Sequence, residues 1–419
     1  MEYIVIIFLF LIFTDTCQTT QLSETHAPTK SYPGSPANED WGYSQVTPGG
    51  YYFWWLYKSD RRSAPLIIWL QGGEDSSTAL GNFVQIGPYD VNFDKRPNTW
   101  LKYADIVFVD NYLGAGFSYT TDHLMETSGD MVAQHLLTWF QDFMQKHPEY
   151  NRRKLYIIGQ SLGGLMAVKF ARLMVMTPGQ HKISGVGLLS PYISLIDYVA
   201  NVPDYLYAFS VIDDAEKVKI SAAVGAFVIA AQPGIPLLSG LPFLTYYNLL
   251  QDTLNGTSDL NIVSLHSRKV LDDLPNKYTP ILNGPIKKYL SQKVRIHSDF
   301  AFKAKDANST LELGETFNAV PDVDFLLTSG IKVTIASGQF DVQTNLLGQY
   351  SWINRLKWPG LSGWINSRRE TFDGKMGGVK AFRKRYNNFA FYNVLGSGHM
   401  ISIDKPVVAI KIMREIIKS

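Results

Sequence analysis

The chain has 419 residues, 46% of them hydrophobic and 18% charged, so it is long enough to bury a large core in one or more domains. Its 39 basic and 37 acidic residues leave a net charge of +2. The longest basic stretch, Lys380–Arg385, is short, and we interpret it as a solvated helix face. A polyanion needs a larger clustered basic surface, so we expect no nucleic-acid partner.

The N-terminus predicts a signal peptide over residues 1–20. Residues 3–13 are an unbroken apolar run, too short to span a bilayer comfortably, and small polar residues follow it over 16–20. This pattern is typical of a secretory signal with its cleavage zone, with a retained anchor as the alternative. No later segment has eighteen consecutive apolar residues. After cleavage we therefore expect no membrane partner.

The cysteine content and the glycosylation tripeptides give information about the cellular compartment of the protein. The single cysteine, Cys17, lies in or beside the predicted signal peptide, so the mature chain has no internal disulfide. This excludes cysteine-protease, zinc-thiolate and redox chemistry. Asn255 and Asn308 each begin an Asn-X-Ser/Thr tripeptide. We expect glycosylation at both, which fits passage through the secretory pathway.

A polar stretch over residues 21–40 predicts a flexible N-terminal arm, after which strand-like and helical patterns alternate. The apolar runs that we interpret as strands lie at 51–57, 65–70, 105–110, 155–158, 331–336 and 389–395. Helical spacing is found over 129–147 and 165–176. Such alternation predicts an α/β fold with a mostly parallel central sheet and helices on both faces.

The alternation stops after about residue 197 and resumes near 326. The segment between them shows helices and loops without a clear strand, including an apolar stretch over 220–231. We therefore predict a first core part over 41–197, a helical insertion over 198–325 and a second core part over 326–419. Such an insertion is expected over the carboxyl ends of the strands, where ligands bind in α/β folds.

The sequence Gly-Gln-Ser-Leu-Gly from Gly159 to Gly163 follows a predicted strand and opens a predicted helix. This is the setting of a nucleophile elbow, in which flanking glycines permit a tight turn that exposes the serine. We predict Ser161 as the nucleophile. The oxyanion donors expected with it are the N–H of Leu162 and the N–H of Gly73 in the loop after the strand 65–70.

A serine hydroxyl needs a base, and the base needs an acid to orient it. In this fold class the acid and then the histidine follow the serine along the chain. Asp341 comes after the predicted strand 331–336, and His399 comes after the strand 389–395 in a Gly-Ser-Gly-His loop. The other histidines lie in the arm, in loops, on a helix or in the insertion. We predict Asp341 and His399 as the acid and the base.

Beyond these residues, the chain resembles the serine carboxypeptidases from about Trp41 to its C-terminus. The resemblance rests on Phe53–Tyr57, Trp69–Gly73, Ile86–Pro88, Thr99–Leu101, Val109–Asn111, Gly116–Tyr119, Asn283–Ile286, Leu356–Pro359 and Gly398–Met400. It implies an α/β-hydrolase fold with a helical insertion over the active site, and a secreted or lysosomal setting. It further implies peptide substrates that lose C-terminal residues, with no metal and no cofactor.

The chain departs from the family pattern around the site. The resemblance implies that Gln71 binds the substrate's terminal carboxylate together with two glutamic acids, but glutamines, Gln85 and Gln160, stand in their places. In the oxyanion loop, Glu74-Asp75 follows Gly73, where the family has proline and glycine. Two alternatives to a carboxypeptidase therefore stay open: a catalytically impaired secreted binding protein, and an esterase or acyltransferase on the same scaffold.

Overall fold

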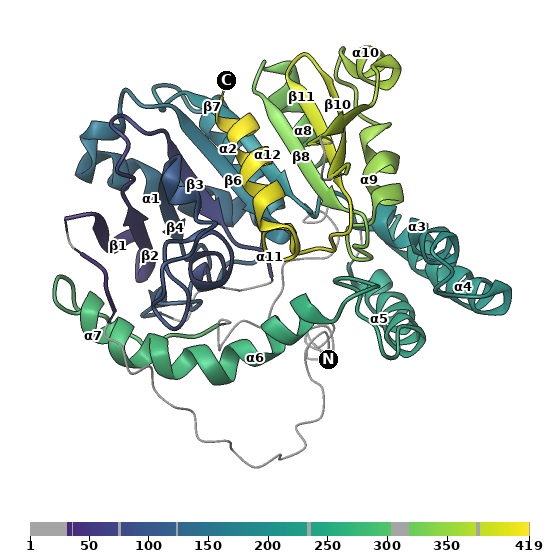
Figure 1. The fold of residues 1–419 in the computed structure, drawn as a ribbon, viewed down its shortest axis with the longest axis horizontal. Coiled ribbons are helices and arrows are strands. Elements are labelled where there is room, and N and C mark those ends of the chain that lie inside the picture. Colours follow the sequence, from purple (N-terminus) through teal and green to yellow (C-terminus); the bar gives the residue numbers. More distant parts are fainter. Residues whose placement is uncertain are drawn as a thin grey trace. The chain divides into compact units, whose positions relative to one another are not determined.

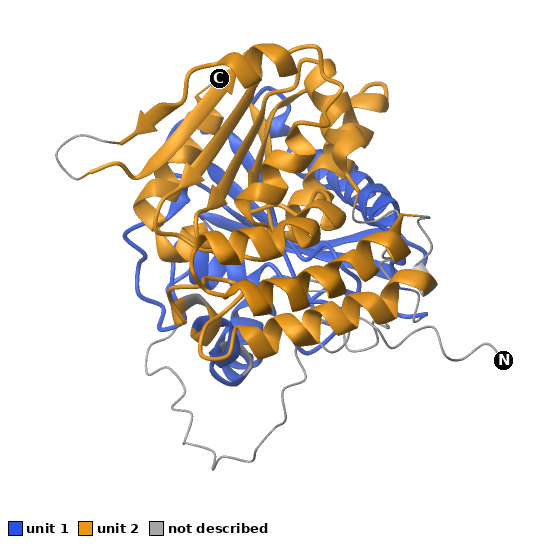
Figure 2. Ribbon diagram, turned by 90° about the vertical axis from the view of Figure 1, so that its right-hand side faces the viewer, with its two compact units in different colours: residues 1–153, 270–311 blue, residues 154–269, 312–419 orange. Residues whose placement is uncertain are grey.

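The structure is a computed structural model that describes residues 32–35, 37–73, 77–122, 125–232, 236–302, 318–373 and 378–418. The chain divides into two units, which are described separately below (Figure 2). Unit 1 comprises residues 1–153 and 270–311, and unit 2 comprises residues 154–269 and 312–419. The predicted signal peptide lies outside the described residues.

Unit 2 contains parallel strands followed by helices. Its strands are β6 (Leu155–Gln160), β7 (Ile183–Leu189), β8 (Val333–Gly338), β9 (Glu370–Phe372), β10 (Ala381–Tyr386) and β11 (Phe389–Val394). They lie in the order β6-β7-β8-β11-β10-β9. The first four are mutually parallel (Figure 1), and β10 and β9 continue the sheet antiparallel.

The register of these strands aligns their carboxyl ends. Leu189 of β7 pairs with Gln160 on one side and with Ala336 on the other, while Gly338 of β8 pairs with Val394. Since parallel strands end on one edge, the loops after β6, β8 and β11 emerge together. These are the loops that carry Ser161, Asp341 and His399.

Helices cover both faces of this sheet. The helices of unit 2 are α2 (Leu162–Met176), α3 (Leu195–Ala208), α4 (Asp214–Ala231), α5 (Pro236–Thr253), α8 (Val320–Thr328), α9 (Leu346–Ile353), α10 (Leu361–Asn366), α11 (Ile401–Asp404) and α12 (Pro406–Ile417). A Cβ on Gly187 of β7 would lie 2.8 Å from Ile416 of α12, and one on Gly164 of α2 would lie 3.8 Å from Leu188. Neighbouring strand residues point to opposite faces, so α12 and α2 pack on opposite sides.

Unit 1 is an aromatic-rich antiparallel region joined to a parallel pair. Its strands are β1 (Glu39–Thr47), β2 (Gly50–Tyr57), β3 (Leu66–Leu70), β4 (Asp105–Val109) and β5 (Tyr119–Thr120). The order is β1-β2-β4-β3, with β3 parallel to β4 and β5 paired to β2. Its helices are η2 (Gly81–Ile86), η3 (Trp100–Lys102), α1 (Gly129–Lys146), η4 (Pro148–Tyr150), η5 (Leu282–Ile286) and α7 (Lys287–Leu290). Helix α6 (His266–Ile281) begins among the residues of unit 2 and ends among those of unit 1.

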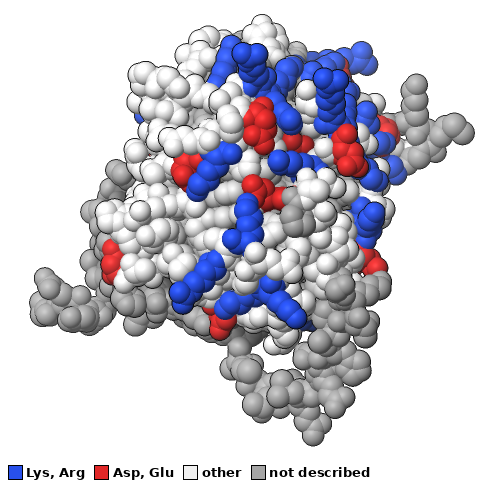
Figure 3. Space-filling view, turned by 90° about the vertical axis from the view of Figure 1, so that its left-hand side faces the viewer, with Lys and Arg blue, Asp and Glu red and all other residues white. Residues whose placement is uncertain are grey.

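One prediction from charge is wrong. Lys380–Arg385 is not a helix face, because residues 381–386 form strand β10. The basic side chains find acidic partners across the sheet: Arg383 Nε donates to Glu370 Oε2 of β9 at 3.0 Å. On the face drawn in Figure 3, basic and acidic side chains likewise lie next to one another. No helix in the described part of the chain has the length and apolar character to cross a bilayer.

A buried carboxyl group anchors the start of unit 1. Glu39 of β1 is 6% exposed and accepts hydrogen bonds from Tyr32 Oη and Trp55 Nε1, both at 3.1 Å. Tyr32 also hydrogen-bonds to Tyr57, and its ring packs on that of Tyr289 of α7. Burial, which penalises the charged form, raises the pKa of Glu39 to about 7.

This pKa predicts that unit 1 loses stability as the pH rises toward neutrality. An acid whose pKa is raised on folding stabilises the fold fully only below its unfolded pKa, here 4.5, and the contribution disappears as the pH passes 7. The loss amounts to about 3 kcal/mol. Glu39→Gln, which keeps the shape without the charge, should be progressively more stable than the wild type between pH 4.5 and 8 in thermal melts.

Asp60→Asn, at an exposed carboxyl group of the same unit, is the matched control and should show no such trend. If Glu39→Gln follows the wild-type melting temperature at every pH, Glu39 is not protonated in the folded protein.

Candidate active site

Ser161 sits on a strained turn between β6 and α2. Its φ of 58° and ψ of −126° are costly for any residue with a side chain, by about 1–3 kcal/mol, and persist only where neighbours enforce them. The backbone of Ser161 donates to Leu189 O at 2.9 Å and accepts from Tyr192 N at 3.0 Å. The side chain is largely buried, with 7% exposed.

Gly159 makes this turn possible. A Cβ at this position would lie 2.0 Å from Gly163 O and 2.7 Å from Gly164 N, and both of these are backbone atoms that cannot swing away. The turn thus brings the chain back over Gly159 so closely that only glycine fits. This is the physical reason for the first glycine of the elbow.

Leu162 begins helix α2, and no side chain caps the N-terminus of that helix. The first N–H groups of a helix have no partner within it, and the helix dipole adds a partial positive charge there. The N–H of Leu162 therefore lies where negative charge is favoured, next to Ser161.

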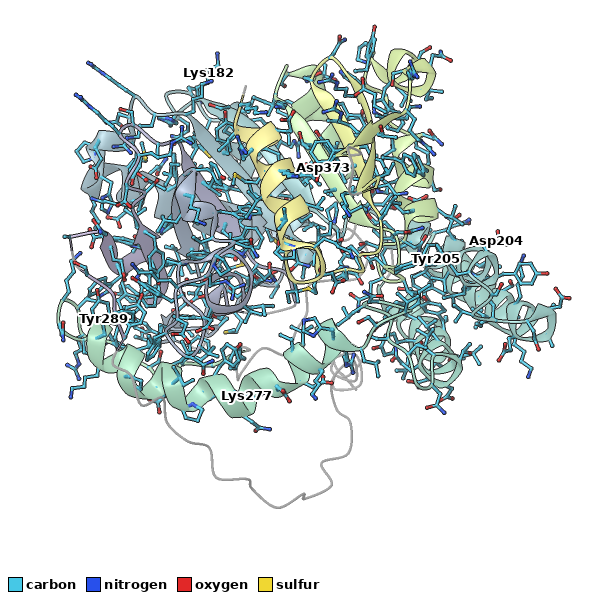
Figure 4. All side chains as sticks on the ribbon, viewed as in Figure 1. Lys182, Asp204, Tyr205, Lys277, Tyr289 and Asp373 are labelled. Carbon is cyan, nitrogen blue, oxygen red and sulfur yellow. The ribbon has the colours of Figure 1, made fainter. Side chains whose placement is uncertain are left out.

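Asp341 is held rigidly in the loop after β8. It is fully buried and accepts two hydrogen bonds from Thr344: from the backbone N to Oδ1 at 3.0 Å and from Oγ1 to Oδ2 at 2.6 Å. In addition, Tyr205 of α3, marked in Figure 4, donates its hydroxyl to Gln339 O of the same loop. These bonds fix the direction of the carboxylate.

His399 meets that carboxylate. Its Nδ1 lies 2.9 Å from Asp341 Oδ2, and the ring is 3% exposed. Because a carboxylate only accepts hydrogen bonds, this contact assigns the ring hydrogen to Nδ1 and the lone pair to Nε2. This is the tautomer that a general base needs.

Ser161 and His399 both lie against Tyr192. The backbone N of Tyr192 bonds Ser161, and its ring centroid is 6.3 Å from that of His399. Among the described residues the Ser161 hydroxyl has no hydrogen-bond partner. Catalytic hydrogen bonds of this kind are often long without substrate and tighten in the reacting complex.

The predicted binding residues Gln71 and Gln85 lie in unit 1, as does Gly73, which has a φ of 96°. Gln71 is fully buried, and its Oε1 accepts from Trp69 Nε1 at 3.0 Å. Gln85 lies in the π-helix η2, and both atoms of its buried amide lack a hydrogen-bond partner in the described part of the chain. Burying an amide without hydrogen-bond partners costs free energy, so both atoms of the Gln85 amide are available to hydrogen-bond a polar ligand. Glu74 and Asp75 lie outside the described residues.

Gln160 lies in unit 2, at the end of β6, and its Nε2 contacts Met400 Sδ at 3.4 Å. Of the predicted glycosylation sites, Asn255 is exposed in the turn after α5, and Asn308 lies outside the described residues. Within the described ranges, no three or more His, Cys, Asp or Glu side chains gather in a way that would hold a metal ion.

The sequence analysis missed two contributors to this site. Thr344 follows Asp341 at a spacing of three, a typical position for a residue whose N–H caps an aspartate, so local spacing signals it. Tyr192 carries no such signal, because its role depends on the position of the loop after β7.

Comparison with solved structures defines the class of fold. The structure of a prohormone-processing carboxypeptidase from Saccharomyces cerevisiae matches with a TM-score of 0.75 over 90% of both chains, at 18% sequence identity. An identity this low speaks for the fold alone. The predicted α/β-hydrolase fold, with its mostly parallel central sheet and helices on both faces, is confirmed.

The family follows from the sequence. The model of the serine carboxypeptidase family (peptidase S10) matches residues 28–419, so the chain belongs to this family of hydrolases. It is 34% identical to serine carboxypeptidase-like 51 of Arabidopsis thaliana, over 92% of this chain and 93% of that protein. It is also similar to the retinoid-inducible serine carboxypeptidase of Mus musculus, at 32% identity over 91% of each.

The crowding at Gly159 predicts that the elbow fails when a methyl group is added. Gly159→Ala should lower the rate of labelling by a fluorophosphonate at least about tenfold, because a misplacement of 1 Å costs up to about a hundredfold. Gly225→Ala on α4, where a Cβ meets no atom within 4 Å, is the control and should label normally. Equal labelling of the two variants would contradict the tight turn.

Proposed function

We propose that this chain is a serine-type carboxypeptidase that releases C-terminal residues from peptides through an acyl-enzyme. Ser161 is the nucleophile, His399 the base and Asp341 the acid that orients it. The observation that carries the proposal is the 2.9 Å contact between His399 Nδ1 and Asp341 Oδ2, in loops that emerge at the same sheet edge as the strained Ser161. Membership of the serine carboxypeptidase family supports the reaction class.

The reaction proceeds in two steps. Nε2 of His399 takes the proton from Ser161 Oγ as the oxygen attacks the carbonyl carbon of the last peptide bond. The imidazolium returns this proton to the leaving amine, and the C-terminal residue departs from a Ser161 ester. A water molecule, deprotonated in turn by His399, hydrolyses the ester and regenerates the hydroxyl.

Groups of the protein that are already in place stabilise the charges that develop in these steps. Buried Asp341 stabilises the imidazolium, and Thr344 keeps the carboxylate pointing at Nδ1. The tetrahedral oxyanion is assigned to the N–H groups of Leu162 and Gly73, of which the first lies at the positive end of α2. Losing one such donor typically costs about a hundredfold or more in rate.

A fluorophosphonate reacts only with an activated serine, so it tests the proposal directly. The wild type should be labelled at Ser161, and Ser161→Ala should not be labelled. In Asp341→Asn, kcat should be lower by about four orders of magnitude, because the amide favours the wrong tautomer of His399.

Three outcomes would contradict this assignment in different ways. An unlabelled wild type indicates the impaired binding protein, and label remaining in Ser161→Ala indicates another nucleophile. A labelled enzyme that cleaves a blocked dipeptide ester but not the dipeptide itself indicates an esterase or acyltransferase.

We further propose that Gln71, Gln85 and Gln160 bind the carboxylate of the substrate. An amide N–H donates at any pH, whereas a carboxyl group donates only while protonated. The wild type should therefore keep its kcat/KM on a blocked dipeptide toward neutral pH. In Gln160→Glu, kcat/KM should fall as the introduced carboxyl group ionises, because the anion repels the substrate.

The measurement is kcat/KM from pH 4.5 to 7.5 for both proteins. A steep decline of the wild-type kcat/KM above about pH 6 would contradict amide recognition. Gln251→Glu, at the end of α5, serves as a control for the added charge.

The compartment is part of the proposal. Secretion or lysosomal residence is supported by the apolar run at residues 3–13 and by the exposure of Asn255 in its sequon. Both features fit a chain that enters the secretory pathway.

A further inference from the structure

A short buried segment of the insertion contacts the loop that carries Asp341. This segment, Ser258–Ile262, lies between α5 and α6, and its five residues are at most 5% exposed. Asp259 O accepts from Val342 N at 3.0 Å, and the N–H of Ile262 donates to Phe340 O at 3.1 Å. The chain on each side of Asp341 is thus bonded to the insertion.

The same segment contacts the loop that carries His399. Leu260 O accepts from the backbone N of His399 itself at 2.7 Å. Asp404 Oδ2 accepts from Gly398 N at 2.7 Å and from Asn261 Nδ2 at 3.0 Å. One carboxylate oxygen therefore joins the insertion to the residue just before His399.

Packing leaves little freedom at this junction. A Cβ on Gly398 would lie 2.1 Å from Leu260 O and 2.5 Å from Asn261 Cβ. The two loops also meet directly, since Phe340 N donates to Ser397 O at 2.8 Å. The separation of Asp341 and His399 is thus fixed from two sides, and one side belongs to the insertion.

We propose that Asn261 and Asp404 are positioning residues for His399. Through the segment Ser258–Ile262, the helical insertion thereby helps to fix the geometry of the catalytic residues. This inference rests on the proposed function of His399 as the base. Asn261 and Asp404 act through the backbone of Gly398 and His399. Their loss shifts the imidazole relative to Ser161 and leaves substrate binding by the glutamines unchanged.

The experiment compares Asp404→Ala, Asp404→Asn and Asn261→Ala with the wild type. In Asp404→Ala, kcat on a blocked dipeptide and the rate of fluorophosphonate labelling should both fall about tenfold or more, while KM stays within about twofold. Asp404→Asn should recover part of the loss, because its side-chain oxygen still accepts from Gly398 N. Asn261→Ala removes the bond to Asp404 and also the one that its Oδ1 accepts from Val263 N at 3.1 Å. Because Asp404 keeps its bond to Gly398 N, kcat of this variant should lie between those of Asp404→Ala and the wild type.

Asp324→Ala is the matched control. Asp324 is a carboxylate of the same unit that also accepts from backbone N–H groups, those of Lys357 and Trp358 at 2.8–2.9 Å. Its loss should lower the melting temperature about as much as that of Asp404, without the fall in kcat or labelling.

Two results would overturn the inference while the proposed function stands. One is wild-type labelling at Ser161 together with normal labelling of Asp404→Ala and Asn261→Ala. The other is an equal loss of kcat in Asp324→Ala, which would show that the effect is general destabilisation. A wild type that is not labelled at all would overturn the proposed function, and the inference with it. Should Asp404→Ala not fold, Asn261→Ala and Asp404→Asn give the same comparison.

Discussion

The hydrogen bond between His399 Nδ1 and Asp341 Oδ2 is the interaction on which the rest of the site depends. A carboxylate buried as completely as Asp341 is stable only if its oxygens are bonded, and Thr344 and His399 together supply those bonds. The same bonds decide which imidazole nitrogen is free. One set of hydrogen bonds therefore both stabilises the buried carboxylate and orients the imidazole ring.

The parallel sheet brings the loops of this pair to the edge at which β6 ends and Ser161 follows. Three strands that end on one edge deliver residues 161, 341 and 399 to one region, although 238 positions separate the first from the last (399 minus 161). The strands set the approximate places of the loops. Contacts between these loops, and hydrogen bonds from the segment Ser258–Ile262 to both of them, then hold Asp341 and His399 relative to one another.

Local patterns in the sequence were enough to predict the fold class. They also predicted that Ser161, Asp341 and His399 follow strands, which is where β6, β8 and β11 end in the structure. The elbow was visible because its glycines answer a local steric demand, as the contact of Gly159 with Gly163 shows. Strand β7 was not predicted, since Gly185 and Gly187 interrupt its apolar run, and Gly187 is needed for the close approach of α12. The prediction of a helix over Lys380–Arg385 was wrong because a basic run on a strand cannot be told from one on a solvated helix. The acidic partner, Glu370, lies on the neighbouring strand and is not visible in the local pattern. The contacts of Leu260 and Asp259 run through backbone carbonyl groups between residues far apart in the chain, and no side-chain pattern reports them.

The buried carboxyl group of Glu39 has a consequence beyond the midpoint of a melting curve. In a neutral medium its ionised form carries a desolvation cost within β1 that the hydrogen bonds from Tyr32 and Trp55 offset only in part. Local opening, and attack by other proteases, would then start at this edge strand. In an acidic medium the carboxyl group is neutral and β1 stays paired, so the protein would resist local unfolding and proteolysis for longer.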